Sequence, residues 1–439
     1  MEHVVVGSSG DLSNKQITPA IINNRLAGNG LYSLIDGLKG ENIGSESIGR
    51  TANKIEDYRK RISLPAGADL FIDSGGYSFI KGLLAESNLD FAISLYQSFL
   101  QLKSETYDFI FSLDIPYSTK FQEFNTIKKV YKYNRISIEQ SIRVLKADPK
   151  LVEKFFFIYH FKTDSHYKIW QDLGGELSIG NYIKYRAIGG MVSLKEMAGI
   201  NIAPFIATTF QCLFDYQNSP FNGEDFRIHF LGISVAYDRF IIAFLERLIQ
   251  RYLGPSVPVL LTYDTIKFKR AAMYRQDYIC EFDGGTLHAH DPLNIPDSYY
   301  RHIYQGNEEI IYLTKQDLIR KASGKKHQNQ ENMAPLTISS ELAIDQFFEH
   351  VIGANEMVEG MIGSRNLIHS KNIFKRKLPE VFGEYNDIFS RQTIKSMIES
   401  LTHVYKFHLW YRDLHDAKTL DQMSLEFINK DINFPFRLS

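Results

Sequence analysis

The stretch LFIDSGGYS, residues 70–78, sets the expectation for the whole fold. A short apolar run ends in an aspartate and passes into a glycine pair, as a buried parallel strand does when it enters a loop. Comparable apolar runs lie at residues 4–6, 109–114, 155–159, 187–191, 228–233 and 257–263. Helical segments separate these runs, and we expect one further strand within residues 16–36. The alternation predicts βα units around a parallel sheet.

The spacing of the apolar runs favours a closed arrangement. From residue 70 onward, the runs start roughly 30 to 45 residues apart, the length of a strand, a helix and two loops in an α/β barrel of about 250 residues. An open doubly wound sheet is the alternative. Residues 235–253 keep apolar side chains at helical spacing and are followed by Gly254 and Pro255, which end a helix. We therefore expect an α/β barrel over residues 1–305.

Composition excludes several classes of protein. Of the 439 residues, 44% are hydrophobic and 23% are charged, which is typical of a folded globular protein and not of a disordered or fibrous one. Only Cys212 and Cys280 are available, so a disulfide framework is excluded and a reducing compartment is indicated. Neither a signal peptide nor a run of about 18 apolar residues is present. We expect a soluble, cytoplasmic protein with no membrane partner.

The pattern changes after about residue 305. Residues 321–332 are polar and indicate a loop, and the remainder of the second predicted domain, residues 306–439, is mainly helical. Because the formal net charge is only −1, a nucleic acid would have to be held by local basic patches. Residues 364–377 lack Asp and Glu but carry Arg365, Lys371, Lys375, Arg376 and Lys377. We interpret them, with Arg270, as candidate phosphate contacts, and a solvated helix face as the alternative.

Three carboxylates close strongly apolar runs, namely Asp73, Asp114 and Asp264. Side chains at the C-terminal ends of barrel strands converge on one mouth. An unpaired charge there is unfavourable unless something binds or uses it. One such aspartate is more often a helix cap or an ion-pair partner, but three together indicate a site.

Two glycine pairs indicate the kind of ligand. Residues 75–76 and 189–190 lack a Cβ, so a planar molecule can lie directly against the backbone. Backbone N–H and C=O groups would then bind the edge of a heterocycle, and Tyr77 would stack on its face. A glycine pair on its own is often only a turn.

Six motifs in a fixed order carry a resemblance to a known superfamily. They are DSGGYS (73–78), SLDIPY (112–117), FIYHF (157–161), AIGGM (187–191), HFLGIS (229–234) and TYDT (262–265). This set resembles the tRNA-guanine transglycosylase superfamily, and it is most similar to the branch that acts on DNA, the DNA 7-deazaguanine transglycosylases of phages and some bacteria. The match covers residues 65–270 as scattered strand ends. DSGGY and AIGG are its more specific parts.

The resemblance implies an irregular TIM (β/α)8 barrel with a mainly helical C-terminal extension, which exchanges guanine for a 7-deazaguanine such as preQ0. Asp264 would attack C1′ of the nucleotide and form a covalent glycosyl-enzyme. Asp73 would protonate the departing base and deprotonate the incoming one, and Asp114 would hold the edge of the base. Such an exchange requires no cofactor.

The resemblance also implies the remaining contacts to the base. Gly190 and Met191 would offer backbone groups beside Gly189, with Tyr77 on one face of the base and Leu231 on the other. DNA is the expected nucleic-acid partner and tRNA the alternative. An inactive nucleic-acid-binding barrel and a carbohydrate hydrolase are further alternatives, and an oligomer is compatible with the resemblance.

The chain also departs from the superfamily pattern. His160 stands where the tRNA enzymes have a glutamine, and it can donate or accept a proton. The three cysteines and one histidine that hold zinc in the tRNA enzymes are missing. The nearest substitutes do not have the required spacing, so we expect no metal: they are Cys280, His288, His290 and His302.

Overall fold

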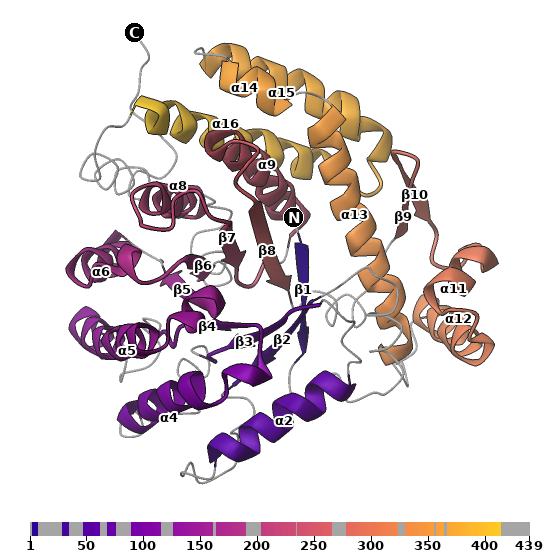
Figure 1. The fold of residues 1–439 in the computed structure, drawn as a ribbon. Helices are drawn as coiled ribbons and strands as arrows, with labels where there is room; N and C mark the ends of the chain where they lie inside the picture. Colours follow the sequence, from indigo (N-terminus) through magenta and orange to yellow (C-terminus); the bar gives the residue numbers. More distant parts are fainter. Residues whose placement is uncertain are drawn as a thin grey trace.

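The structure is a computed structural model. It describes residues 2–7, 29–34, 47–61, 68–75, 89–115, 126–160, 164–189, 203–233, 235–265, 278–323, 330–354, 357–363 and 367–413. Within these ranges a curled, parallel sheet forms the centre of the molecule and helices surround it (Figure 1). The predicted α/β class with a parallel sheet is therefore confirmed.

The strands of this sheet pair in the order of the chain, and β1 also pairs with β8, so the sheet closes on itself. They are β1 (Glu2–Gly7), β2 (Asn29–Ser33), β3 (Leu70–Asp73), β4 (Phe109–Phe111), β5 (Phe155–His160), β6 (Tyr185–Gly189), β7 (Phe226–Phe230) and β8 (Val259–Thr265). Seven of them coincide with the predicted apolar runs, and β2 is the further strand expected within residues 16–36. Buried parallel strands are apolar on both faces, which is why these runs were recognisable.

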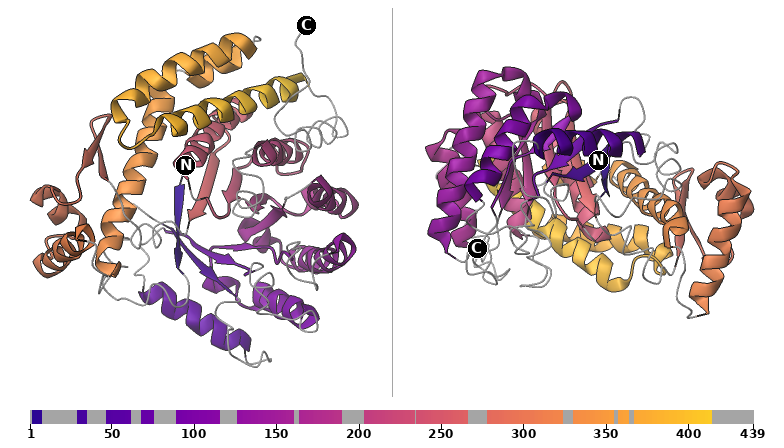
Figure 2. Two further views of the ribbon diagram at one scale, coloured as in Figure 1. Left: turned by 180° about the vertical axis from the view of Figure 1, so that it is seen from behind. Right: turned by 90° about the horizontal axis from the view of Figure 1, so that it is seen from below.

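Helices connect the strands from β2 onward and cover the outer face of the sheet (Figures 1 and 2). They are α2 (Ser47–Arg61), α4 (Leu89–Leu102), α5 (Ile127–Ala147), α6 (Asp164–Glu176), α8 (Ala203–Gln217) and α9 (Ala236–Leu253). Helix α9 ends as predicted, because Gly254 has φ +80° and donates its N–H to Gln250 O at 2.9 Å. Short 3-10 helices lie at Ser104–Thr106, Pro149–Lys154 and Ile179–Asn181.

Aromatic side chains fill the inside of the closed sheet. Phe71, Phe109, Phe111 and Phe156 are buried there with Tyr185. Neighbouring rings lie within contact distance, for example 4.9 Å between the centroids of Phe71 and Phe109 and 5.1 Å between those of Phe156 and Tyr185. The interior is a packed core and not a pore, so a ligand site has to lie at one of its two ends.

The chain continues beyond β8 with a hairpin and a group of helices. These are β9 (Ile279–Asp283), β10 (Thr286–His290), α11 (Asp297–Ile303), α12 (Glu308–Ala322), α13 (Ala334–Ala354), α14 (Met357–Gly363), α15 (Leu367–Phe382) and α16 (Arg391–Asp413), with 3-10 turns at Gln330–Met333 and Gly383–Tyr385. Helices α13 and α16 both pack against α9. Phe240 of α9 contacts the rings of Phe348 and Phe382, so one hydrophobic core runs from the sheet into the C-terminal helices.

A buried network of charges joins α9, α13 and β8. Arg239 of α9 donates hydrogen bonds to the carboxylate and the backbone carbonyl of Glu341, and its Nη1 lies 2.8 Å from Asp345 Oδ1. Tyr263 of β8 donates a hydrogen bond to the same Asp345 carboxylate. The arginine is only 2% exposed. The C-terminal region is thus attached directly to the strand that carries Asp264.

Among the helices of the described ranges, none combines the length and the apolar character that a bilayer-spanning helix needs. The predicted domain boundary at residues 305–306 falls between α11 and α12 and stays a prediction.

Candidate functional site

The three predicted acids lie at the same end of the sheet. Asp73 is the last residue of β3, Asp114 follows β4 by three residues, and Asp264 is the penultimate residue of β8. Because all these strands are parallel, their C-terminal ends share one side of the core. Asp114 is 4% exposed and Asp264 is 7% exposed, whereas Asp73 is half-buried.

Asp73 and Asp114 are neighbours. Ser74, which follows Asp73, donates a hydrogen bond from its hydroxyl to Asp114 Oδ1 at 3.1 Å. The pKa of the nearby Tyr96 is raised by burial first, then by Tyr107, Asp114 and Asp73. The charges of both carboxylates therefore raise the pKa of the same tyrosine hydroxyl. This hydroxyl donates a hydrogen bond to Phe111 O at 2.8 Å.

Polar side chains hold the loop that carries Asp114. Asn134 of α5 accepts a hydrogen bond from Ile115 N and donates one to Ile115 O, both at 2.8 Å. One turn further along α5, Ser137 donates to Leu113 O at 2.9 Å. Sequence reasoning missed these supports. Their signal is a row of polar residues at helical spacing, 134, 137 and 141, on the otherwise apolar buried face of α5.

His160 completes the surroundings of Asp114. It is the last residue of β5, and its Nε2 forms a short hydrogen bond with Asp114 Oδ2. In the neighbouring strand Gly189 lies opposite His160. A Cβ on Gly189 would be 2.9 Å from His160 Cε1 and 3.0 Å from Nε2. The glycine at 189 thus leaves room for the histidine ring, whereas the sequence had indicated room for a ligand.

We expect Gly189→Ala to displace His160 from Asp114, because the added methyl group overlaps the ring. Overpacking of this kind lowers the free energy of unfolding by about 1–3 kcal/mol, which chemical denaturation measures. Gly175→Ala is the matched control, since nothing lies within 4 Å of its added Cβ and α6 continues through it. In the His160→Ala background the Gly189→Ala change should cost nothing, and an unchanged cost there would contradict the assigned clash.

Asp264 is held by two hydrogen-bond donors. Gly232 donates its backbone N–H to Asp264 Oδ1 at 2.9 Å, and His229 Nε2 lies 3.2 Å from the same oxygen. His229 is fully buried in β7. In the sequence it is the first residue of the HFLGIS motif, and no local pattern predicts its role. Leu231, two residues later, is half-buried and packs against the inner aromatic core, so it lies at the same end as Asp264.

The four predicted basic residues that the structure describes, all on α15, do not join this group. Lys371, Lys375 and Arg376 of α15 are exposed, and Lys377 lies 3.7 Å from Glu380. Phe382 contacts Phe240 near the start of α9, and Phe374 contacts Phe244 one turn further along. Since α9 starts at the end of the sheet where Asp264 lies, α15 begins away from that end and runs toward it. Lys371 is therefore directed toward the opposite end.

Lys371 instead forms part of a positive cluster with α16. Burial lowers the pKa of Lys406, and the charge of Lys371 lowers it further. Burial, Lys406 and Lys371 together lower the pKa of His403 to about 4. The remaining predicted contacts lie outside the described residues: Tyr77, Gly190, Met191, Arg270 and Arg365.

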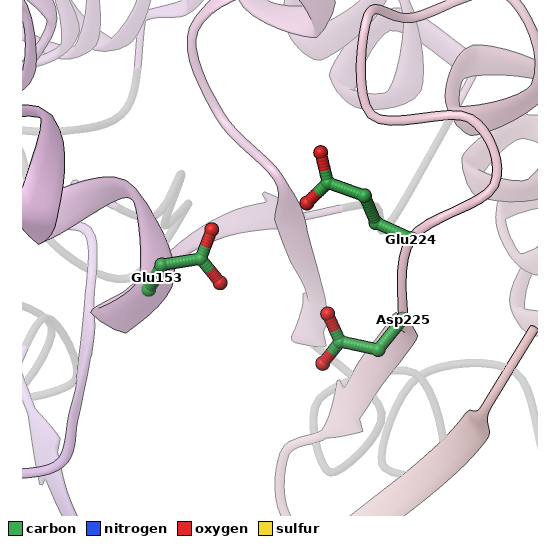
Figure 3. Close-up of side chains that lie close together, drawn as sticks. All are labelled: Glu153, Glu224 and Asp225. Carbon is green, nitrogen blue, oxygen red and sulfur yellow. The ribbon is translucent and has the colours of Figure 1, made fainter.

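Three other carboxylates also face one another, but at the opposite end of the sheet. Figure 3 shows Glu153, Glu224 and Asp225, whose oxygens are close enough to bind one metal ion. The ammonium of Lys184 lies 2.7, 2.8 and 2.6 Å from them, respectively. Burial lowers the pKa of Lys184, but these hydrogen bonds outweigh it and hold the pKa above its usual value. The lysine compensates the acids, so this cluster supports the fold.

Comparisons with known proteins do not identify the chain. No protein-family model matches it, and no curated protein sequence matches it either. Asp264 is held through a single oxygen, Asp114 is held by Ser74 and His160, and Asp73 lies next to Asp114 at the same end of the sheet. Carboxylates arranged in this way suit covalent group transfer with proton transfer.

Proposed function

We propose that the protein is a DNA-guanine transglycosylase that exchanges guanine in DNA for a 7-deazaguanine base such as preQ0. The observation that supports this most strongly is the position of Asp73, Asp114 and Asp264 at the same end of the closed parallel sheet. The sheet would be the core of an irregular TIM (β/α)8 barrel, in which catalytic groups come from the C-terminal ends of different strands.

In the first step of the proposed reaction, Asp264 Oδ2 attacks C1′ of the target nucleotide. The bond between C1′ and the base breaks, its electron pair leaves with guanine, and Asp73 supplies the proton that neutralises the departing base. The product is a glycosyl ester on Asp264. A carboxylate suits this step because the transition state resembles an oxocarbenium ion.

In the second step a 7-deazaguanine replaces guanine. Asp73 takes the proton from its ring nitrogen, that nitrogen attacks C1′, and the ester bond breaks to restore the Asp264 carboxylate. Atoms and charge balance without a redox change or an activated group. Water has to be excluded while the ester exists, and the packed aromatic core below the site removes one route for its entry.

Asp114 is suited to holding the edge of the base. Its two oxygens accept from Ser74 and pair with His160, yet a carboxylate offers about four acceptor positions in total. It can therefore also accept N–H donors from a purine-like ring. The basic residues Lys371, Lys375, Arg376 and Lys377 stay predicted phosphate contacts, and their position on α15 requires a nucleic acid that extends around the barrel.

The test is incorporation of labelled guanine or labelled preQ0 into duplex DNA and, in parallel, into total tRNA. We expect the label to enter DNA and to remain after denaturation and removal of the protein. Label in tRNA alone would change the assigned substrate. No label in either nucleic acid, with release of free sugar from a panel of glycosides, would replace base exchange by glycoside hydrolysis.

A further inference from the structure

We propose that His229 is the positioning residue of Asp264, and that it makes Oδ2 the attacking atom and Oδ1 the oxygen that takes up the returning charge. This inference rests on the proposed function. It concerns a residue that lies below the site and does not itself reach the base.

The surroundings of His229 fix its ring. The side chain is fully buried inside the sheet, with its ring centroid 4.7 Å from that of Phe111 and 5.5 Å from that of Phe71. Residue 229 pairs with Thr262 in the register between β7 and β8. The ring therefore has one stable orientation, set by packing on its faces and by hydrogen bonds at its two nitrogens.

Thr262 helps to determine which ring nitrogen of His229 carries the proton. Its hydroxyl lies 2.8 Å from His229 Nδ1, while Nε2 lies 3.2 Å from Asp264 Oδ1. In a neutral imidazole one nitrogen donates and the other accepts. A carboxylate only accepts, so Nε2 carries the proton and Nδ1 accepts from the threonine hydroxyl. Residues 262 and 264 face the same side of β8 because side chains alternate along a strand.

The two oxygens of Asp264 are consequently different. Oδ1 accepts from His229 and from Gly232 N–H, and Gly232 reaches this position with φ +76°, which favours glycine. Within the described part of the chain, Oδ2 accepts no hydrogen bond. An oxygen without donors is the better nucleophile, and an oxygen with two donors is the better place for negative charge.

This difference affects the two steps of exchange unequally. In the ester, Oδ2 is bonded to C1′ and Oδ1 is a neutral carbonyl oxygen. When the incoming base breaks the ester, negative charge returns to the carboxylate, and the His229 Nε2–H stabilises it on Oδ1. Loss of this donor should therefore slow breakdown of the ester more than its formation.

The test compares three variants on a labelled DNA substrate. His229→Phe keeps an aromatic ring between Phe71 and Phe111 but has no donor, whereas His229→Gln places an amide N–H near the position of Nε2. Thr262→Val keeps the shape of residue 262 and removes only the hydroxyl that holds Nδ1. Single-turnover release of guanine measures ester formation, and a chase of the isolated covalent complex with excess base measures its breakdown.

We expect His229→Phe to slow ester breakdown on the order of 10- to 100-fold and to raise the fraction of enzyme found covalently bound on denaturing gels. His229→Gln should restore breakdown at least in part. Thr262→Val should also slow ester breakdown relative to ester formation, but by a smaller factor. This variant keeps the test valid if the phenylalanine variant does not fold.

Equal slowing of both steps in His229→Phe and Thr262→Val would show a purely structural role and overturn the inference, as would wild-type rates for both steps. These results require a wild-type enzyme that forms the covalent complex. If the wild-type protein forms none and exchanges no base, it is the proposed function that fails.

Discussion

Asp264→Ala is expected to abolish base exchange and the covalent protein–DNA complex together. Removal of an enzyme's nucleophile typically reduces turnover by about 10⁴-fold or more. The alanine leaves Gly232 N–H and His229 without their acceptor, but it introduces no new charge into the site. The measurement is incorporation of labelled base into DNA, with denaturing gels to detect the covalent complex.

Asp264→Asn separates chemistry from binding. The amide oxygen can still accept both hydrogen bonds at the Oδ1 position, while the amide nitrogen at the Oδ2 position is not a nucleophile. We therefore expect DNA binding close to wild type with no exchange. Asp297→Asn, at an exposed aspartate of α11 paired with Lys315, is the matched control and should leave exchange unchanged. Full exchange by Asp264→Ala would remove Asp264 from the mechanism.

Arg239→Ala is expected to cause the largest loss of stability, about 3–5 kcal/mol in the free energy of unfolding. The substitution leaves Glu341 and Asp345 buried without their cation. Burial already raises the pKa of Asp345 to about 6, although Arg239 acts to lower it. Without the arginine the carboxyl group binds its proton still more tightly in the folded state.

This raised pKa sets the sign of the pH dependence. A folded-state pKa above the unfolded value means that stability falls as pH rises between the two values. The loss caused by Arg239→Ala should therefore be smaller near pH 5, where Asp345 can be protonated, than near pH 8. Urea denaturation followed by circular dichroism, for wild type and variant at both pH values, measures this loss of stability.

Arg251→Ala is the matched control for Arg239→Ala. Arg251 also lies on α9 and pairs with a glutamate of the C-terminal region, Glu359 of α14, but their side chains are 49% and 45% exposed. Exposed pairs contribute about 0–1 kcal/mol, so we expect little change. Similar losses for both arginine variants would contradict the role assigned to the buried network.

Most of the strand arrangement could be predicted from the sequence. The run at residues 70–73 identified β3 because a strand buried on both faces is continuously apolar, and the same signal located β4 to β8. It also placed Asp73, Asp114 and Asp264 at strand ends, and parallel pairing then brings such ends to one side. The boundary of the C-terminal region stays a prediction, because α13 and α16 share a hydrophobic core with α9.

The roles of individual side chains could not be predicted in the same way. Gly189 indicated space for a ligand, but His160 fills that space because residues 160 and 189 are opposite in the register of β5 and β6. The contact between His229 and Asp264 depends on the register of β7 and β8. The contact of Lys184 with the three acids of Figure 3 forms only because the starts of β5, β6 and β7, which are far apart in sequence, lie side by side in the sheet.

The sequence alone therefore determined the class of fold, the strands and the end at which the acids gather, since burial and periodicity are local properties of the chain. The tertiary structure alone decided which oxygen of Asp264 is held, what surrounds Asp114 and which charges are compensated. Those outcomes depend on register and closure of the sheet, which bring together side chains that no local pattern relates.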